Sequence, residues 1–316
     1  MASAVTSGVV LALLVSPVRA EPPPAEPAVP VFAQPSLDPA SAATHSSFDS
    51  PPLTTQRPLN FVPPLTQPSL GYWDAGVGAA SLAGSLLWSF LPVRHGGLWQ
   101  HQLLPFEGQV KGNFSTRAQT YSDVALGLSL ATPLAFDGAR GLDGAMARRS
   151  AIYAETLIVN LALFEGVKHI VGRPRPYLYS AAPAAQDYAA GRGNDGWQSF
   201  YSGHSSTAFA AAVSGAWLYS QSSDNVPMRT AVWATNLALA GATANLRVRA
   251  GQHFPSDVLV GAAVGSALGY LIPRLHYRGK HVRSLSTPEW VAIVAAPLLG
   301  ALIGQCLPLE SREPFP

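Results

Sequence analysis

The chain is poor in charge and in cysteine. Only 12% of its 316 residues are charged and the formal net charge is +2, which argues against a basic face of the kind that binds nucleic acid. The single cysteine, Cys306, excludes an intramolecular disulfide framework and a cysteine-rich metal site. Hydrophobic residues make up 48% of the chain, a composition that suits closely packed helices in or near a membrane better than a charged cytosolic enzyme.

The sequence also has little strand-like alternation, and apolar runs separated by Gly-, Pro- and Arg-rich loops take its place. The runs cover residues 75–93, 122–136, 150–171, 202–220, 230–246, 256–272 and 289–304. They predict an all-α protein, a helical bundle of about six core helices that is membrane-embedded or membrane-associated. The high Ala and Gly content of the runs, with Glu155 and Glu165 inside one of them, leaves a soluble helical domain as the alternative.

The first seventy residues differ from the rest. Residues 1–20, MASAVTSGVVLALLVSPVRA, contain a short apolar core before Val18-Arg19-Ala20 and predict a secretory signal peptide, or else an uncleaved N-terminal anchor. Residues 21–70 are rich in proline and predict a disordered tether. We expect a helical domain over residues 71–275, followed by a C-terminal loop and one further apolar helix in residues 276–316.

The first motif is KHIVGRPRP, Lys168 to Pro176. Lys168 closes an apolar run, and Arg175 follows after six intervening residues, immediately before a proline. A guanidinium can bind two phosphate oxygens at once and an ammonium supplies a compact charge, while prolines restrict the loop that carries them. The motif therefore predicts a phosphate site, or alternatively a cationic cap on a helix C-terminus.

The second motif is SFYSGHSSTAFAAA, which begins at Ser199. Ser202, Gly203 and His204 open an apolar helix there, so backbone N–H groups of its first turn can point at an anion, and glycine lets that anion come close. His204 has the pKa range of a proton donor to a leaving group. An ordinary serine N-cap beside a histidine is the alternative interpretation.

The third motif is NLRVRAGQHFPSDVLVG, which contains Arg247, His253 and Asp257. If Pro255 begins a helix, the carboxylate of Asp257 can turn back to His253 and fix its tautomer, which leaves the other nitrogen free as a nucleophile. A hydrogen bond without catalytic meaning, or half of a metal site, is the alternative for this His–Asp pair.

In this order and spacing, the three motifs closely resemble the signature of the type 2 phosphatidic acid phosphatase superfamily, over roughly residues 122–273. That superfamily also includes bacterial class A acid phosphatases and vanadium haloperoxidases. The resemblance implies that a phosphoryl group is held by three cations and by hydrogen bonds from the helix start. The residues that match these positions are Lys168, Arg175, Arg247, Ser202 and Gly203.

The resemblance also implies a reaction that needs no metal and no other cofactor. His253 would attack phosphorus to give a phosphohistidine, and Asp257 would orient His253 and stabilise its charge. His204 would protonate the leaving oxygen and then activate water. Two positions depart from the pattern: Tyr201 stands where proline is usual, and Leu246 where serine is usual.

Four further charged residues lie in or near the motifs. We expect Arg173 and Arg249 to bind lipid headgroups or to have no specific role. For Asp123 and Glu165 we expect a helix cap or an interhelical hydrogen bond, although a carboxylate at either position could instead hold Lys168 or Arg175 in place.

The sequence thus predicts a phosphatase that hydrolyses a phosphomonoester or diphosphate of a lipid, either phosphatidate or an isoprenoid diphosphate, at a membrane. A soluble periplasmic acid phosphatase is the main alternative, and a vanadium haloperoxidase and a non-catalytic envelope protein are the others. The expected location is a bacterial-type cell envelope, in the inner membrane or periplasm, with an external active site. If residues 75–93 span a membrane and the N-terminal tail is exported, however, three crossings place residues 168–176 on the cytosolic side.

Overall fold

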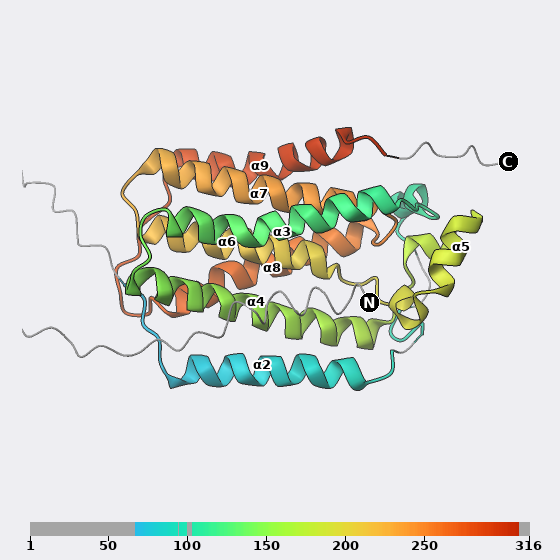
Figure 1. Cartoon of the computed structure of the whole chain (residues 1–316), viewed down its shortest axis with the longest axis horizontal. Coiled ribbons are helices and arrows are strands. Elements are labelled where there is room, and N and C mark those ends of the chain that lie inside the picture. The colour runs from blue at the N-terminus through green and yellow to red at the C-terminus, as the bar shows by residue number, and fades with distance from the viewer. Residues whose placement is uncertain (1–66, 94, 100–102, 310–316) are drawn as a thin grey trace, which may run out of the picture. The chain divides into compact units, whose positions relative to one another are not determined.

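A computed structural model describes residues 67–309 with the exception of 94 and 100–102. Over these residues the protein is helical and has no strand, so the predicted all-α bundle is confirmed. The long helices run along one common axis (Figure 1). They are α2 (Tyr72–Phe90), α3 (Thr116–Gly138), α4 (Gly144–Val171), α6 (Gly203–Gln221), α7 (Val226–Arg249), α8 (Pro255–Leu275) and α9 (Thr287–Cys306).

Shorter elements fill the connections at one end of this bundle. They are the 3₁₀ turns η1 (Pro105–Val110), η2 (Pro176–Tyr179) and η3 (Gly193–Trp197), and the short helix α5 (Pro183–Ala190). The expected signal peptide or anchor, and residues 21–66 of the expected tether, lie outside the described residues.

Local sequence signals decide where the motif-bearing helices begin and end. The side chain of Asp143 accepts a hydrogen bond from the backbone N–H of Met146 at 2.7 Å and so caps the start of α4. Gly172 ends that helix with a φ of 62°, in the left-handed conformation that glycine adopts without strain. Pro255 is the first residue of α8, as the sequence predicts. The first motif therefore leaves α4 at Gly172, and the third motif enters α8 at Pro255.

Glycine lets neighbouring helices approach one another closely. A Cβ atom built on Gly265 of α8 would lie 2.1 Å from the carbonyl oxygen of Ser206 in α6, and one on Gly261 would lie 2.6 Å from that of Ser202. No side chain fits at such distances. Small residues allow this close approach of two helices, and the approach fixes the start of α6 against the start of α8.

Gly265→Ala is expected to destabilise the bundle by about 1–3 kcal/mol, because α6 and α8 must move apart to admit the methyl group. Gly127→Ala in α3 is the matched control, since a Cβ there meets nothing within 4 Å and alanine raises helix propensity. Thermal unfolding of both variants in the same detergent checks the difference. Equal melting temperatures would contradict the close α6–α8 contact.

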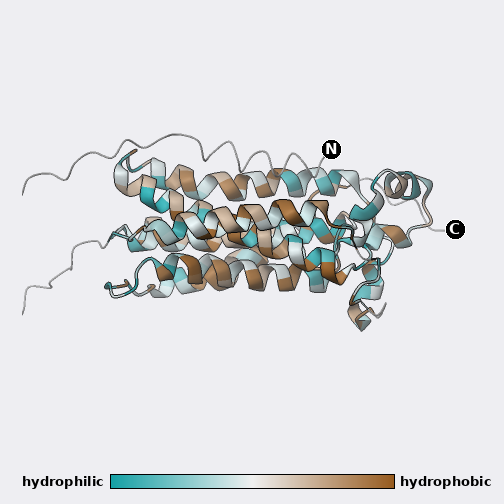
Figure 2. Cartoon of the chain, turned by 90° about the horizontal axis from the view of Figure 1, so that it is seen from below, coloured by the Kyte–Doolittle hydropathy of each residue, from teal (hydrophilic) through white to brown (hydrophobic). Residues whose placement is uncertain are grey.

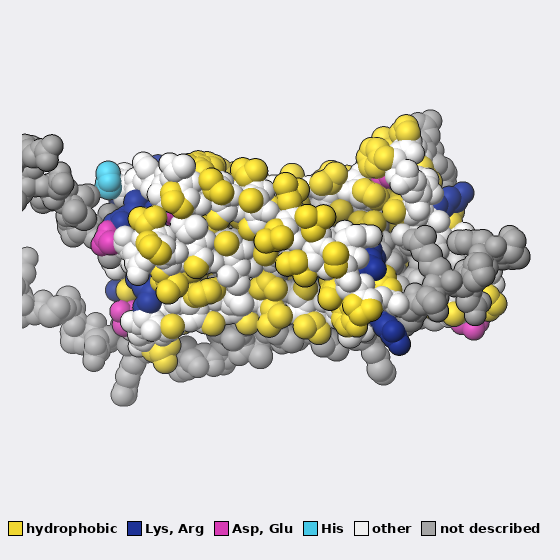
Figure 3. All heavy atoms as spheres, turned by 90° about the horizontal axis from the view of Figure 1, so that it is seen from above, with side chains coloured by type: hydrophobic (Ala, Val, Ile, Leu, Met, Phe, Trp, Pro, Cys, Tyr) yellow, Lys and Arg dark blue, Asp and Glu magenta, His cyan; other side chains and the backbone are white. Residues whose placement is uncertain are grey.

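Much of the outer surface of the bundle is apolar. Within the part of the chain that the structure describes, three segments are long and apolar enough to cross a membrane, namely residues 144–179, α8 and α9, which suggests membrane association. Hydrophobic residues occur along the length of the helices (Figure 2). On the face shown in Figure 3, apolar side chains cover the middle and charged side chains gather towards the two ends. The exposed ones on α9 include Trp290, Val294, Leu298 and Leu302.

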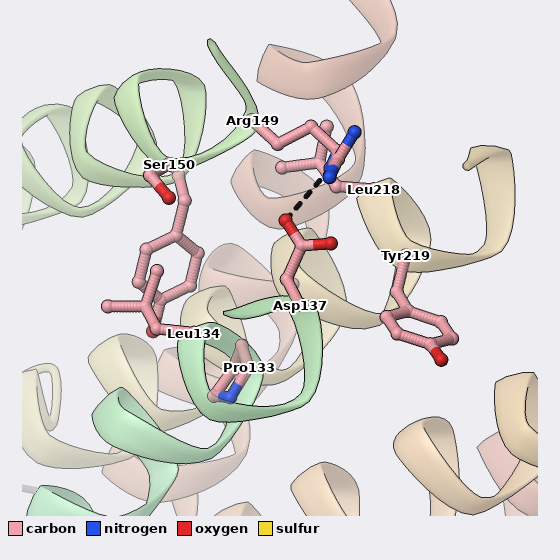
Figure 4. Close-up of a pocket in the computed structure, with 9 residues that line it drawn as sticks. Pro133, Leu134, Asp137, Arg149, Ser150, Leu218 and Tyr219 are labelled. Carbon is pink, nitrogen blue, oxygen red and sulfur yellow. Dashed lines mark hydrogen bonds and ion pairs between the residues drawn. The ribbon is translucent and has the colours of Figure 1, made fainter. Parts of the chain in front are cut away.

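The end of the bundle opposite the three motifs is held by its own polar contacts. Next to the C-terminus of α8, His276 has Nε2 at 3.0 Å from the Glu155 carboxylate and Nδ1 at 2.8 Å from the carbonyl oxygen of Ser69. A small pocket nearby contains a buried ion pair in which Arg149 Nε lies 2.8 Å from Asp137 (Figure 4). These contacts fix the start of α2 at the end remote from the predicted site.

Candidate active site

The structure brings the three motifs together at one end of the bundle. A Cβ on Gly203, at the start of α6, would lie 3.2 Å from Lys168 Nζ, near the end of α4. The backbone N–H of Ser202 donates to the carbonyl of Asp257 at 3.0 Å, which joins the second motif to the third. The predicted nucleophile His253 lies between α7 and α8 and is 1% exposed.

The electrostatic surroundings of His253 show which groups face it. Its burial, followed by the positive charges of Arg175, Arg247 and Lys168, holds the pKa of its imidazole well below the ordinary value of 6.5. His204 adds a smaller contribution of the same sign. The cations that the sequence predicts as phosphate ligands therefore surround one neutral imidazole.

Each of the three cations has one carboxylate neighbour: Glu165 Oε1 lies 3.6 Å from Lys168 Nζ, Asp195 Oδ1 2.8 Å from Arg175 Nη2, and Asp123 Oδ1 3.4 Å from Arg247 Nη1. The cationic side chains are 5–11% exposed and the carboxylate side chains 28–50%. The carboxylates thus lie nearer to solvent and keep the buried cations paired when no phosphate is bound. For Glu165 this contact, made within α4, matches the alternative that it holds Lys168 and not the helix cap or interhelical hydrogen bond that we expected.

Arg175 is fixed by several acceptors at once. Its Nε donates to the carbonyl of Asp195 at 2.8 Å, and its Nη1 donates to the side-chain oxygen of Gln252 at 2.7 Å. Although burial acts in the opposite direction, the charges of Arg175 and then Lys168 hold the pKa of Asp195 below its usual range. The sequence did not indicate Asp195 or Gln252, although Gln252 directly precedes the predicted nucleophile.

Arg247 retains hydrogen-bonding capacity. Its Nη1 donates to Ser122 Oγ at 3.2 Å, but its Nε is buried and has no hydrogen-bond partner among the described residues. A buried donor without a partner costs about 1–3 kcal/mol. An anion that supplies an oxygen to this nitrogen would remove that cost, so the guanidinium is prepared to bind one.

His204 and Asp123 form the more open side of the site. His204 Nε2 lies 2.9 Å from Asp123 Oδ1, and the same oxygen contacts Arg247. Burial and then the charge of Arg247 lower the pKa of His204 to about 4, although Asp123 acts in the opposite direction, so the ordinary pKa range that we expected for His204 is wrong. Asp123 thus makes the interhelical contact that we expected, from α3 to α6 and α7. The alternative, that Asp123 holds Lys168 or Arg175, is wrong, because the cation that Asp123 contacts is Arg247.

The predicted direct hydrogen bond between His253 and Asp257 is not the one that the structure has. His253 Nδ1 lies 2.7 Å from the carbonyl oxygen of Ser199, whereas the nearest Asp257 oxygen is 4.0 Å away. Asp257 instead accepts from Ser199 Oγ at 2.6 Å and from the backbone N–H of Phe254 at 2.8 Å. A backbone carbonyl can only accept, so Nδ1 carries the proton and Nε2 keeps its lone pair.

Ser202 and Gly203 form the helix start that the sequence predicts. Ser202 Oγ accepts from the backbone N–H of Ser205 at 3.3 Å, which confirms its N-cap interpretation and leaves its hydroxyl proton as a donor. A Cβ on Gly203 would lie 2.9 Å from the Phe164 ring. Glycine is therefore required at this position by packing alone.

The structure also places the two residues that depart from the family pattern and the two arginines outside the predicted site. Tyr201 and Leu246 are both buried, and Leu246 packs with Ala118 and Ala250. The expectation that Arg173 binds lipid headgroups or has no specific role is wrong, because its side chain is fully buried between two carboxylates. Arg249 donates to the carbonyls of Gly304 and Leu307, which end α9.

The fold and the site together define an α-helical protein in which three cations and two histidines gather at one end of the bundle. A family model described as PAP2 superfamily matches residues 149–280, a segment that contains all eight of the predicted site residues. The match confirms the resemblance carried by the three motifs and supports a phosphatase-type activity. Among curated proteins and solved structures, none matches the chain.

Proposed function

We propose that this protein is a metal-independent phosphatase that hydrolyses a phosphorylated lipid, either a phosphatidate or an isoprenoid diphosphate, through a phosphohistidine intermediate. The observation that carries the proposal is the buried Nε of Arg247, which has no partner among the described residues, together with the lone pair that Nε2 of His253 keeps. The charge of Arg247 acts on His253. A phosphoryl group fits both atoms. Its oxygens can accept a hydrogen bond from Arg247 Nε, and its phosphorus can accept the lone pair of His253 Nε2.

The reaction takes place in two steps. In the first, His253 Nε2 attacks phosphorus while the bond from phosphorus to the leaving oxygen breaks, and His204 gives that oxygen a proton. In the second, water attacks the phosphohistidine, His204 takes the proton from water, and inorganic phosphate leaves. Lys168 and the two site arginines stabilise the charge on the three non-bridging oxygens throughout.

The position of the site favours a lipid substrate. The site lies where the long helices end, and three of the segments in this bundle are long and apolar enough to cross a membrane. A phosphorylated headgroup held at the polar edge of a bilayer would reach such a site while its acyl or isoprenoid chain stays among apolar side chains. A soluble phosphate ester lacks this second interaction, and we therefore expect it to bind more weakly.

Phosphate release by the detergent-purified full chain tests the proposal. The substrates are phosphatidic acid, an isoprenoid diphosphate and p-nitrophenyl phosphate, each with a metal chelator present. Release that survives chelation and is fastest with a lipid is the expected result. No release from any of the three esters would contradict it, and halide oxidation that depends on added vanadate would then identify a haloperoxidase.

Cys306 offers a test of the external location that we propose for the site. This cysteine is exposed at the end of α9, next to the site end of α7. In spheroplasts we expect a membrane-impermeant maleimide to label the natural chain but not Cys306→Ser/Asp224→Cys, whose cysteine lies in the loop at the opposite end. The reverse pattern would place the site in the cytosol, and labelling of both would contradict a membrane-spanning bundle.

A further inference from the structure

A cluster of buried charges contains Asp257 of the proposed site together with Arg173 and Glu107, which have no role in that site so far. Arg173, two residues before Arg175, is 0% exposed, as are Glu107 and Asp257. Arg173 Nη2 lies 2.7 Å from Glu107 Oε2, and its Nη1 contacts Asp257 Oδ1. One buried cation therefore joins two buried carboxylates that are far apart in the sequence.

The surroundings hold this guanidinium in one place. It lies 3.9 Å from the ring centre of Trp99 and 4.2 Å from that of Phe254, a geometry that stabilises a cation against two aromatic faces. Ser256 accepts from Arg173 Nη1 at 2.8 Å and donates to Glu107. Removing one partner from such a cluster would leave a buried charge unpaired, so the network sits rigidly in the fold.

Two separate contacts lead from Arg173 to Ser199, the residue that holds the nucleophile. Through its side chain, Arg173 fixes Asp257, whose Oδ2 accepts from Ser199 Oγ at 2.6 Å. Through its backbone, the carbonyl of Arg173 accepts from the N–H of Ser199 at 2.9 Å. The carbonyl of Ser199 then accepts the Nδ1 proton of His253 at 2.7 Å. The position of the imidazole therefore depends on the position of Arg173.

We propose that Arg173, held by Glu107, is a positioning residue for the nucleophile. The inference rests on the proposed function, in which His253 must present Nε2 to phosphorus in line with the leaving oxygen. Neither residue touches substrate. The pair fixes Asp257 and Ser199, and these fix the tautomer and the ring orientation of His253. A displacement of about 1 Å in a reacting group can cost on the order of 10²-fold in rate. We therefore expect loss of this network to lower kcat and to change KM little.

The test compares Arg173→Lys and Glu107→Gln with Arg229→Lys. Arg229 is the matched control, because it makes a similarly buried ion pair, 2.6 Å from Glu289, at the opposite end of the bundle. We expect all three variants to lower the melting temperature. Only the first two should lower kcat, by about 10- to 100-fold, with KM changed by less than about threefold, when the assay runs below every melting temperature.

The double variant Arg173→Lys/Glu107→Gln adds a readout that general destabilisation would not reproduce. If the two residues act as one unit, the double variant should lose about as much kcat as the worse single variant, rather than the product of the two losses. A loss of kcat in Arg229→Lys equal to that in Arg173→Lys would overturn the proposal. The proposal would also be overturned if Arg173→Lys and Glu107→Gln raised KM and left kcat unchanged.

The outcome also separates this inference from the proposed function. If the natural chain releases no phosphate, or His253→Ala releases as much as the natural chain, the function itself fails. If His253→Ala is inactive while Arg173→Lys and Glu107→Gln keep the natural kcat, only the positioning role fails. Glu107→Gln keeps the shape and one acceptor of the natural side chain, so it tests the proposal even if the lysine variant does not fold.

Discussion

His253→Ala is expected to abolish phosphate release, with a loss of kcat of at least about 10³-fold, the scale on which removal of a covalent nucleophile acts. His204, the second imidazole of the site, has its Nε2 at 2.9 Å from Asp123, and the proposed mechanism assigns it to the leaving oxygen and not to attack on phosphorus. Because His253 is 1% exposed, the alanine variant also leaves a cavity and should unfold at a lower temperature.

His276→Ala is the matched control for that loss of stability. His276 is also a buried histidine, 6% exposed, but it lies at the opposite end of the bundle with Glu155 and Ser69. We expect this variant to be destabilised and to keep its kcat at temperatures below unfolding. Equal activity of His253→Ala and the natural chain would contradict histidine nucleophilic catalysis.

The intermediate gives a direct measurement of the same step. A phosphoryl group on a histidine nitrogen is stable in base and labile in acid, unlike one on serine. Rapid quenching in base of natural chain mixed with ³²P-labelled substrate should therefore retain label on the protein, and His253→Ala should retain none. Label that survives acid would point to a serine as nucleophile, for which Ser202 at the start of α6 is a candidate.

The helices, and the helix ends that carry the three motifs, could be predicted from the sequence because both depend on local spacing. Apolar periodicity predicted the long helices, and a proline at position 255 predicted the start of α8 that the structure has. The short, fixed spacing within each motif kept its charged residues at one helix end. Helix packing then only had to bring these ends together, which the α6–α8 glycine contact does.

The hydrogen-bond and ion-pair partners of the site residues could not be predicted from the sequence, because they come from distant segments of the chain. Glu107 is 66 residues before Arg173, and its carboxylate reaches Arg173 only once η1 packs under the start of α8. The four-residue spacing of His253 and Asp257 suggested a direct hydrogen bond. A carbonyl of the second motif, at Ser199, takes that place instead. Sequence spacing thus predicts which side chains share a helix end, whereas the tertiary packing of loops decides which atoms meet.

Arg247→Lys is expected to lower kcat/KM by about 10²- to 10³-fold, the scale for loss of one preorganised donor to transition-state charge. The ammonium keeps the positive charge but loses the planar array of donors, including the buried Nε that has no partner among the described residues. Because this donor would bind phosphate oxygens before and during the reaction, the inhibition constants of inorganic phosphate and vanadate should rise as well.

Arg249→Lys is the matched control for that substitution. Arg249 lies on the same helix two residues further on and donates to the carbonyls of Gly304 and Leu307, which end α9. We expect it to affect stability and leave kcat/KM unchanged. If Arg247→Lys instead retained the natural kcat/KM and the natural inhibition by phosphate and vanadate, the unpartnered nitrogen would not face the phosphoryl group. Charge alone would then account for binding, since lysine supplies charge as well as arginine does but cannot supply the same fork of hydrogen bonds.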